Sequence, residues 1–329
     1  MALFGLLYTE DVGSAFRDIE LKAPFLIFPL IFSTVKLKTE SLHFVMKNFL
    51  LGVLAATVLA GIKVLYFKIN GLGNYLYYQD LYEFIDKHTT YFALFVVIAM
   101  LYLLQKFFTS TSKKQYYLIA YIFFVGVLYV LSVRISVIAL AAGSIILIIH
   151  HLNSRIKYAV IALVALLIGS LYITPNFQKR FEPSQIENSE INDADFRKLH
   201  WQAVAETIAH NSLLIGNGTR GNRDYLYSKY KDYGLTSAYE DEYNAHNQYL
   251  ETLLDFGILG LLMFFLMLFY IAKLTLKENY LGFSILGVFL IFMFTESILE
   301  RQSGIVIFSF FMTIIAVTVS NLRAKLDNS

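Results

Sequence analysis

The chain has 329 residues, of which 57% are hydrophobic and 16% charged, and its mean hydropathy is +0.56. These values lie far from those of an ordinary soluble domain and predict a polytopic, all-α membrane protein surrounded by membrane lipids. Cysteine is absent, which excludes disulfides and thiolate metal sites, and a formal charge of +2 is too small to indicate a nucleic-acid partner.

Apolar runs close to the ~20 residues that cross a bilayer follow one another along the chain. In order they cover residues 24–35, which is short, then 44–67, 91–105, 115–131, 135–150, 158–173, 256–272, 281–296 and 304–320. Between the sixth and seventh runs lies a long polar loop, residues 174–255. We therefore expect a bundle of transmembrane helices with one sizeable loop that contains short helices.

Short basic clusters separate several of the runs. With the sides alternating, one face receives Lys106, Lys113, Lys114, Arg155, Lys157, Lys273, Lys277, Arg323 and Lys325. By the positive-inside rule this face is cytoplasmic, so the long loop faces outward.

Within the loop, an amphipathic helix is predicted to begin at Asp195, capped by Asn192 or Asp193, and to end near Asn211. Residues 216–222 are rich in turn formers, and their spacing does not fit a dinucleotide-binding fingerprint. The segment that contains His246 is expected to be a helix that runs on into the next span.

His246 places a titratable imidazole where a soluble loop meets lipid. An interfacial histidine can simply be solvated by headgroups or be hydrogen-bonded in a helix cap. Its neighbours Asn247 and Glu251, at i and i+4, favour a site that faces the loop. Such a histidine can take a proton near neutral pH and suits chemistry on lipid-linked substrates.

Three arginines are candidates for binding an anion. Arg134 sits between two apolar runs at a tight outward hairpin, where it either snorkels to the interface or grips phosphate oxygens in a bidentate way. Arg197 lies beside Trp201, and Arg220 lies in the glycine-rich turn. The plain alternatives are a surface arginine at position 197 and a turn that serves the backbone alone at residues 216–222. The histidines show no metal-ligand spacing, and Glu296, Glu300 and Arg301 form a charged cluster whose members can pair with each other.

The order of these elements resembles the O-antigen ligase and O-antigen polymerase superfamily. The elements read Ser132-Val133-Arg134, Arg197-x-x-x-Trp201, Leu214-x-Gly216-x-Gly218 and His246-Asn247-x-x-Leu250-Glu251. Two departures are a Ser-Val-Arg where relatives usually have Ser-Arg, and fewer N-terminal helices, so we expect a chain that is short at its N-terminus, with residues 1–8 as the end of a spanning helix. The expected division is 1–125 as N-terminal helices, 126–268 as the ligase-like core and 269–329 as C-terminal helices.

The resemblance implies a metal-independent, inverting glycosyltransferase of the C-type multi-helix class, without a cofactor, on the periplasmic face of a bacterial inner membrane. Its donor would be a glycan on a polyprenyl (undecaprenyl) diphosphate, and its acceptor lipid A-core or another glycan. On this reading His246 is the base, Arg134, Arg197 and Arg220 bind the diphosphate, and Asn247, Glu251 and Trp201 support them.

Three alternatives stay open. A polysaccharide polymerase of the same superfamily would use the same base and clamp with a different acceptor. A polysaccharide transporter would also be polytopic, but the two halves of the chain lack matching broken helices. An inactive paralogue is the third.

Overall fold

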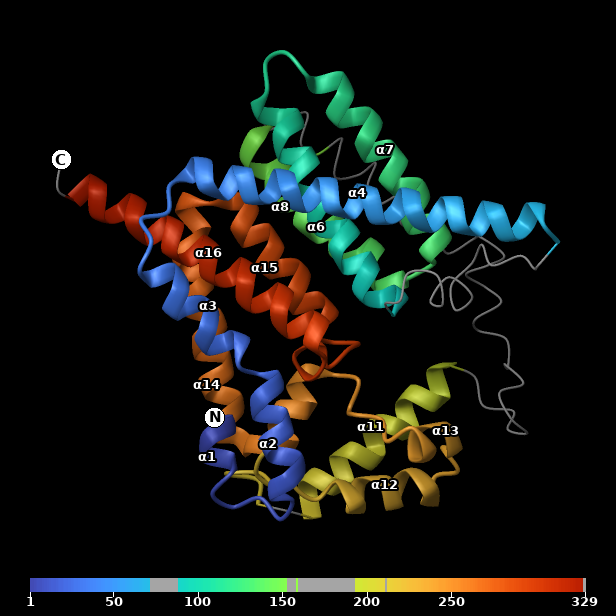
Figure 1. The fold of residues 1–329 in the computed structure, drawn as a ribbon. Helices are drawn as coiled ribbons and strands as arrows, with labels where there is room; N and C mark the ends of the chain where they lie inside the picture. The colour runs from blue at the N-terminus through green and yellow to red at the C-terminus, as the bar shows by residue number, and fades with distance from the viewer. Residues whose placement is uncertain (72–87, 153–157, 159–192, 211, 328–329) are drawn as a thin grey trace. The chain divides into compact units, whose positions relative to one another are not determined.

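The computed structural model describes residues 1–71, 88–152, 158, 193–210 and 212–327, and in these ranges it contains helices and no strand (Figure 1). Within the described residues, six helices are long and apolar enough to cross a membrane: α4 (Thr39–Ile69), α6 (Thr89–Thr109), α7 (Lys114–Leu131), α8 (Arg134–His151), α14 (Gln248–Glu278) and α16 (Gln302–Asp327). The shorter ones are α1 (Ala2–Gly5), α2 (Val12–Leu21), α3 (Pro24–Ser33), α11 (Asp193–His210), α12 (Arg223–Asp232), α13 (Thr236–Glu240), α15 (Tyr280–Phe292) and the 3-10 helix η1 (Ile298–Glu300). The chain is a polytopic all-α membrane protein, as predicted.

Two of the predicted spans are shorter than expected. The run 24–35 yields α3, a helix of 10 residues with Pro29 inside it. The run 281–296 yields α15, which ends at Phe292 after 13 residues because the polar Thr295, Glu296 and Ser297 follow and make contacts outside a helix. The run 158–173 lies, apart from its first residue, outside the described residues.

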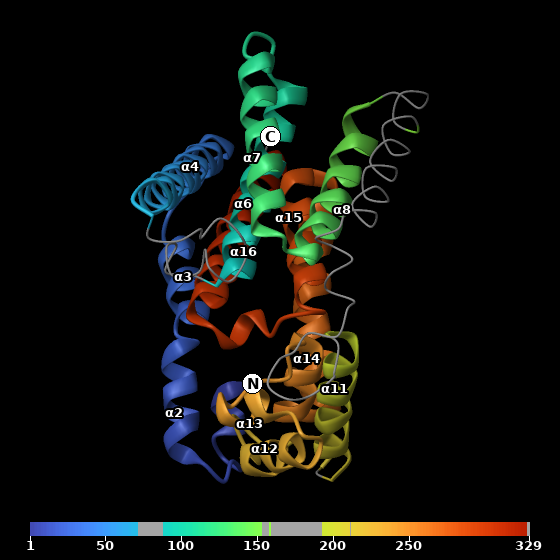
Figure 2. The same ribbon diagram turned by 90° about the vertical axis from the view of Figure 1, so that its right-hand side faces the viewer.

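The chain forms two compact units, and α14 and α16 contribute residues to both. One unit comprises residues 28–165, 271–292 and 310–329. In it, α8 and α15 lie side by side, and α6 packs against α4, α7, α8 and α15 (Figure 2). The small Gly143 allows this close packing, because a Cβ there would come within 2.8 Å of the Leu101 side chain.

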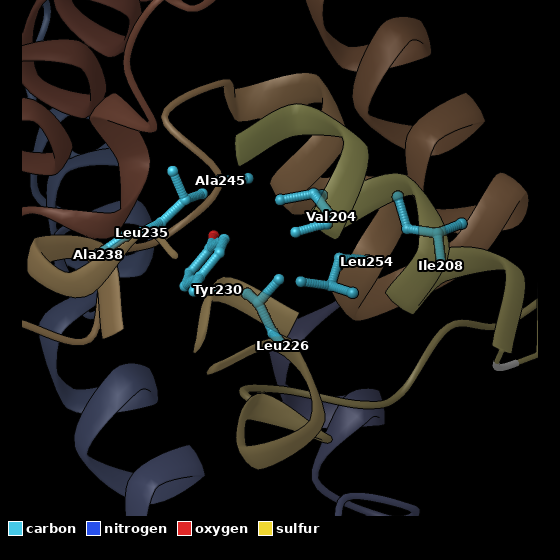
Figure 3. Close-up of a cluster of buried hydrophobic side chains, with 9 residues drawn as sticks. Val204, Ile208, Leu226, Tyr230, Leu235, Ala238, Ala245 and Leu254 are labelled. Atoms are coloured by element: carbon cyan, nitrogen blue, oxygen red, sulfur yellow. The ribbon is translucent and has the colours of Figure 1, made fainter. Parts of the chain in front are cut away.

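The other unit comprises residues 1–27, 166–270 and 293–309 and holds most of the polar loop. The predicted loop helix is confirmed as α11, which packs against α12, while α12 packs against α13. Figure 3 shows their shared core, in which Tyr230 of α12 lies among buried aliphatic side chains. That core is formed by Ala203, Val204, Ile208, Leu226, Tyr230, Leu235, Ala238, Ala245 and Leu254.

A break in α14 joins this loop to the spanning helix. Gly257 adopts φ 61° and ψ −165°, so the helical ladder is interrupted there. The glycine-rich turn takes over the interrupted hydrogen bonds: Asn217 and Gly218 donate their N–H groups to the carbonyls of Leu254 (3.1 Å) and Asp255 (2.9 Å). The backbones approach so closely that a Cβ on Gly216 would lie 2.6 Å from Asp255 backbone atoms. The prediction of a backbone turn is confirmed.

The N-terminal segment packs on the same turn. The Thr219 hydroxyl donates to the Ala2 carbonyl (2.7 Å), and the Tyr8 hydroxyl donates to the Ile215 carbonyl (2.7 Å). The reading of residues 1–8 as the end of a spanning helix, the short N-terminus and the threefold division of the chain stay predictions.

Candidate functional site

His246 precedes α14 and does not lie on a helix, contrary to expectation. Its backbone is left-handed, with φ 44°, and its N–H donates to Oδ1 of Asn244 (3.0 Å). The helix begins only at Gln248 because the Asn247 side chain caps it, accepting from the N–H groups of Tyr249 (3.0 Å) and Leu250 (3.1 Å). Asn247, predicted as a supporting residue, thus orients the chain directly after His246.

The imidazole of His246 faces a carboxylate from a distant part of the chain. Its Nδ1 lies 3.4 Å from Oε2 of Glu296, and the two side chains are 30% and 17% exposed. The prediction that Glu296, Glu300 and Arg301 pair among themselves is wrong for the two glutamates, because Glu300 binds Lys22 at 2.9 Å. A half-exposed histidine with a carboxylate on one ring nitrogen leaves the other nitrogen able to accept a proton.

Three further hydrogen bonds fix the two segments that bring this pair together. The Asn247 N–H donates to the Ser297 hydroxyl (3.2 Å), and the Gln248 N–H donates to the Met293 carbonyl (2.8 Å). In return, the Leu299 N–H donates to Oε1 of Gln248 (2.7 Å). These bonds join the segment that carries His246 to the segment that carries Glu296 and contribute to the geometry of the pair.

A second histidine, which the sequence did not single out, lies next to His246. The ring centroid of His200, on α11, is 5.4 Å from that of His246, and His200 stacks on Tyr230 at 4.7 Å. Burial, with smaller contributions from the charges of His246 and Arg197, lowers the pKa of His200 to about 3. His200 is therefore neutral at physiological pH.

Two of the three candidate arginines lie in the same unit as His246. Arg197 is exposed on α11, within electrostatic range of His200, and Trp201 one turn later is half-buried. Arg220 is half-buried with φ 58°, and its charge acts on Tyr227 and Glu251. Arg197 thus acts on His200, the neighbour of His246, and Arg220 acts on Glu251, which contacts the Ala245 N–H.

Arg134 is the first residue of α8. Ser132, with φ 52°, turns the chain between α7 and α8, so the predicted short connection is confirmed, while its outward position stays a prediction. Arg134 is half-buried and belongs to the compact unit that does not contain His246. Its nearness to His246 stays a prediction.

Beneath His246 lies a network of buried charges. Arg223, the first residue of α12, binds Glu251 at 2.7 Å and also binds Asp255. Glu251 accepts the Ala245 N–H through Oε2 (2.7 Å), and Lys22 binds Asp18 (2.8 Å) and Glu300 (2.9 Å). Burial, opposed by Lys22, raises the pKa of Glu300 to about 8. Glu251, predicted as a supporting residue, is fully buried in this network.

The same carboxylates are the strongest candidates for metal ligands within the described ranges. Oxygen atoms of Glu251, Asp255 and Glu300 lie within 4.8 Å of one another. Arg223 and Lys22 already neutralise these groups at hydrogen-bonding distance. We therefore assign the cluster as an ion-pair network.

Comparison with known proteins agrees with this picture. Residues 118–265 match the family described as O-antigen ligase, a range that includes α7, α8, the loop and the first turns of α14. The chain is similar to a Rickettsia conorii protein that has the provisional name polysaccharide ligase, with 28% identity over 180 residues, which is 52% of this chain and 42% of the relative. The chain thus spans less than half the length of that relative.

Proposed function

We propose that the protein is a membrane glycosyltransferase that moves a glycan from a polyprenyl-diphosphate donor to an acceptor hydroxyl. The observation that carries this proposal is the His246–Glu296 pair, a partly exposed imidazole 3.4 Å from a carboxylate. His246 lies within residues 118–265, which match the family, and Glu296 lies after them. The acceptor we favour is a lipid A-core sugar, which makes the reaction O-antigen ligation.

In the proposed step, the acceptor oxygen attacks the anomeric carbon of the donor sugar and the bond from that carbon to the diphosphate oxygen breaks. The acceptor proton passes to Nε2 of His246, because Nδ1 faces Glu296. Glu296 stabilises the imidazolium that forms. A single displacement of this kind inverts the configuration at the anomeric carbon.

The leaving diphosphate receives the negative charge, so fixed cations near it lower the barrier. We assign this role to Arg134, Arg197 and Arg220, whose guanidinium groups can bind phosphate oxygens in a bidentate way and need no metal ion to do so. Arg197 and Arg220 are supported by their place in the unit that holds His246. Trp201, Asn247 and Glu251 support the site: Asn247 caps α14, and Glu251 pairs with Arg223 and accepts the Ala245 N–H.

The proposal places this chemistry on the periplasmic face of a bacterial inner membrane. Its support is the distribution of basic residues, which collects on the face opposite the long loop. The donor in this location is undecaprenyl diphosphate bearing a glycan.

A polymerase remains the second candidate, because the family and the base fit both reactions. Deletion of the gene followed by lipopolysaccharide profiling separates the two. A core without long chains, together with accumulation of lipid-linked polymer, identifies a ligase, whereas a core bearing a single repeat unit identifies a polymerase. An unchanged profile of every surface glycan contradicts both.

A further inference from the structure

Six ionisable side chains form the buried network next to the His246 segment. Arg223 comes from α12, Glu251 and Asp255 from α14, and Glu300 from η1. Asp18 and Lys22 come from α2 and its C-terminal cap. All six side chains are 15% exposed or less, and all belong to one compact unit.

One end of the network reaches the peptide next to His246. Glu251 has one oxygen on Arg223 and the other on the Ala245 N–H, at 2.7 Å each. His246 follows directly, in a left-handed conformation that is uncommon for a residue with a Cβ. The Arg223–Glu251–Ala245 chain of contacts holds the peptide that precedes it.

The other end reaches the segment that carries Glu296. Lys22 holds Glu300, whose own N–H donates to the Ser297 carbonyl at 3.0 Å. Ser297 directly follows Glu296, and its hydroxyl accepts the Asn247 N–H. The network therefore contacts both segments that bear the His246–Glu296 pair. The contacted residues are Ala245, next to His246, and Ser297, next to Glu296.

We propose that Arg223, Glu251 and Lys22 are positioning residues that hold His246 and Glu296 at their working distance. The proposal rests on the assignment of that pair as the reacting base. An ordinary structural ion-pair network would affect only the stability of the fold, whereas a positioning network also sets the local order of residues 243–250 and the rate of the chemical step.

Glu251→Gln tests one end of the network and Lys22→Met the other, in the full-length protein in detergent or proteoliposomes. The glutamine keeps the shape of Glu251 but removes its charge from Arg223. We expect faster hydrogen exchange in the peptide that covers Ala245 and His246. We also expect kcat per folded molecule to fall at least about tenfold at little change in KM, since misplacement of a reacting group by about 1 Å can cost about 100-fold.

Glu206→Gln is the matched control. Glu206 also pairs with a lysine and a tyrosine in this unit, but on its surface, so exchange near His246 and kcat should both stay at their original values.

A lower melting temperature in both test variants, with unchanged exchange at 243–250 and unchanged kcat per folded molecule, overturns the positioning role. If one variant fails to fold, the other decides the question from the opposite end. If the unaltered protein transfers no glycan, the proposed function fails, and the exchange data still decide whether the network orders the His246 segment.

Discussion

His200 is a buried, neutral histidine, with consequences for stability in acid. Burial lowers its pKa from 6.5 to about 3. Above pH 6.5 neither the folded nor the unfolded chain binds a proton at this residue. Between pH 6.5 and about 3 only the unfolded chain does, so acidification favours unfolding by up to about 1.4 kcal/mol per pH unit.

We therefore expect His200→Gln to reduce the loss of thermal stability between pH 7 and pH 5, whatever its stability at pH 7. Melting temperatures of the purified protein at the two pH values measure this. His210→Gln, an exposed position on the same helix, should leave the acid sensitivity as it is. Equal acid sensitivity of His200→Gln and the original protein would contradict the buried, neutral state.

The arginine assignments depend on the shape of the guanidinium as well as on its charge. Arg134→Lys and Arg197→Lys should each lower transfer by roughly 10- to 100-fold, because a lysine offers a point charge where two parallel hydrogen bonds are needed. Arg17→Lys, on an exposed position of α2, is the control. Initial rates at saturating acceptor measure the effect, and full activity in either test variant removes that residue from the diphosphate clamp.

At the scale of elements, the break in α14 is a structural requirement. Gly257→Ala would force a Cβ into a left-handed backbone position, 2.5 Å from backbone atoms of Leu214. We expect it to cost about 1–3 kcal/mol and to lower the melting temperature of the protein. Gly61→Ala, in α4 with open space around it, should be neutral or slightly stabilising. Equal melting temperatures for the two variants would show that the close contact between the glycine-rich turn and the break at Gly257 does not stabilise the protein.

The sequence predicted elements better than it predicted their ends. Long apolar runs identify α4, α6, α7, α8, α14 and α16, because a bilayer demands about 20 apolar residues. The start of α14 was misplaced, since Asn247 competes for the helix N–H groups through its side chain and excludes His246 from the helix.

The site could be predicted only in part for a related reason. His246, Asn247 and Glu251 are neighbours in the sequence, so their pattern is visible there. Glu296 lies 50 residues from its partner. Arg223 lies 28 residues before Glu251, and only the packing of α12 against the start of α14 brings the two together.

At the scale of the whole molecule, the orientation in the membrane is open to a direct test, because the chain has no cysteine. Ser228→Cys, on α12, should react with a membrane-impermeant maleimide in intact spheroplasts. Ser112→Cys, between α6 and α7, should react only after permeabilisation. Both serines are exposed. The opposite pattern would place the loop in the cytoplasm. The loop could then not act on a donor at the periplasmic face, and the proposed location would be wrong.

The most direct measurement of the central claim is glycan transfer by the purified protein in proteoliposomes, with an undecaprenyl-diphosphate-linked glycan and lipid A-core. The original protein should form the lipid-linked product and release undecaprenyl diphosphate. His246→Ala should fold and insert normally but transfer about 10²–10⁴-fold more slowly, as expected for loss of a general base. Equal rates for the two proteins, or no transfer by either to any glycan acceptor, would contradict the account.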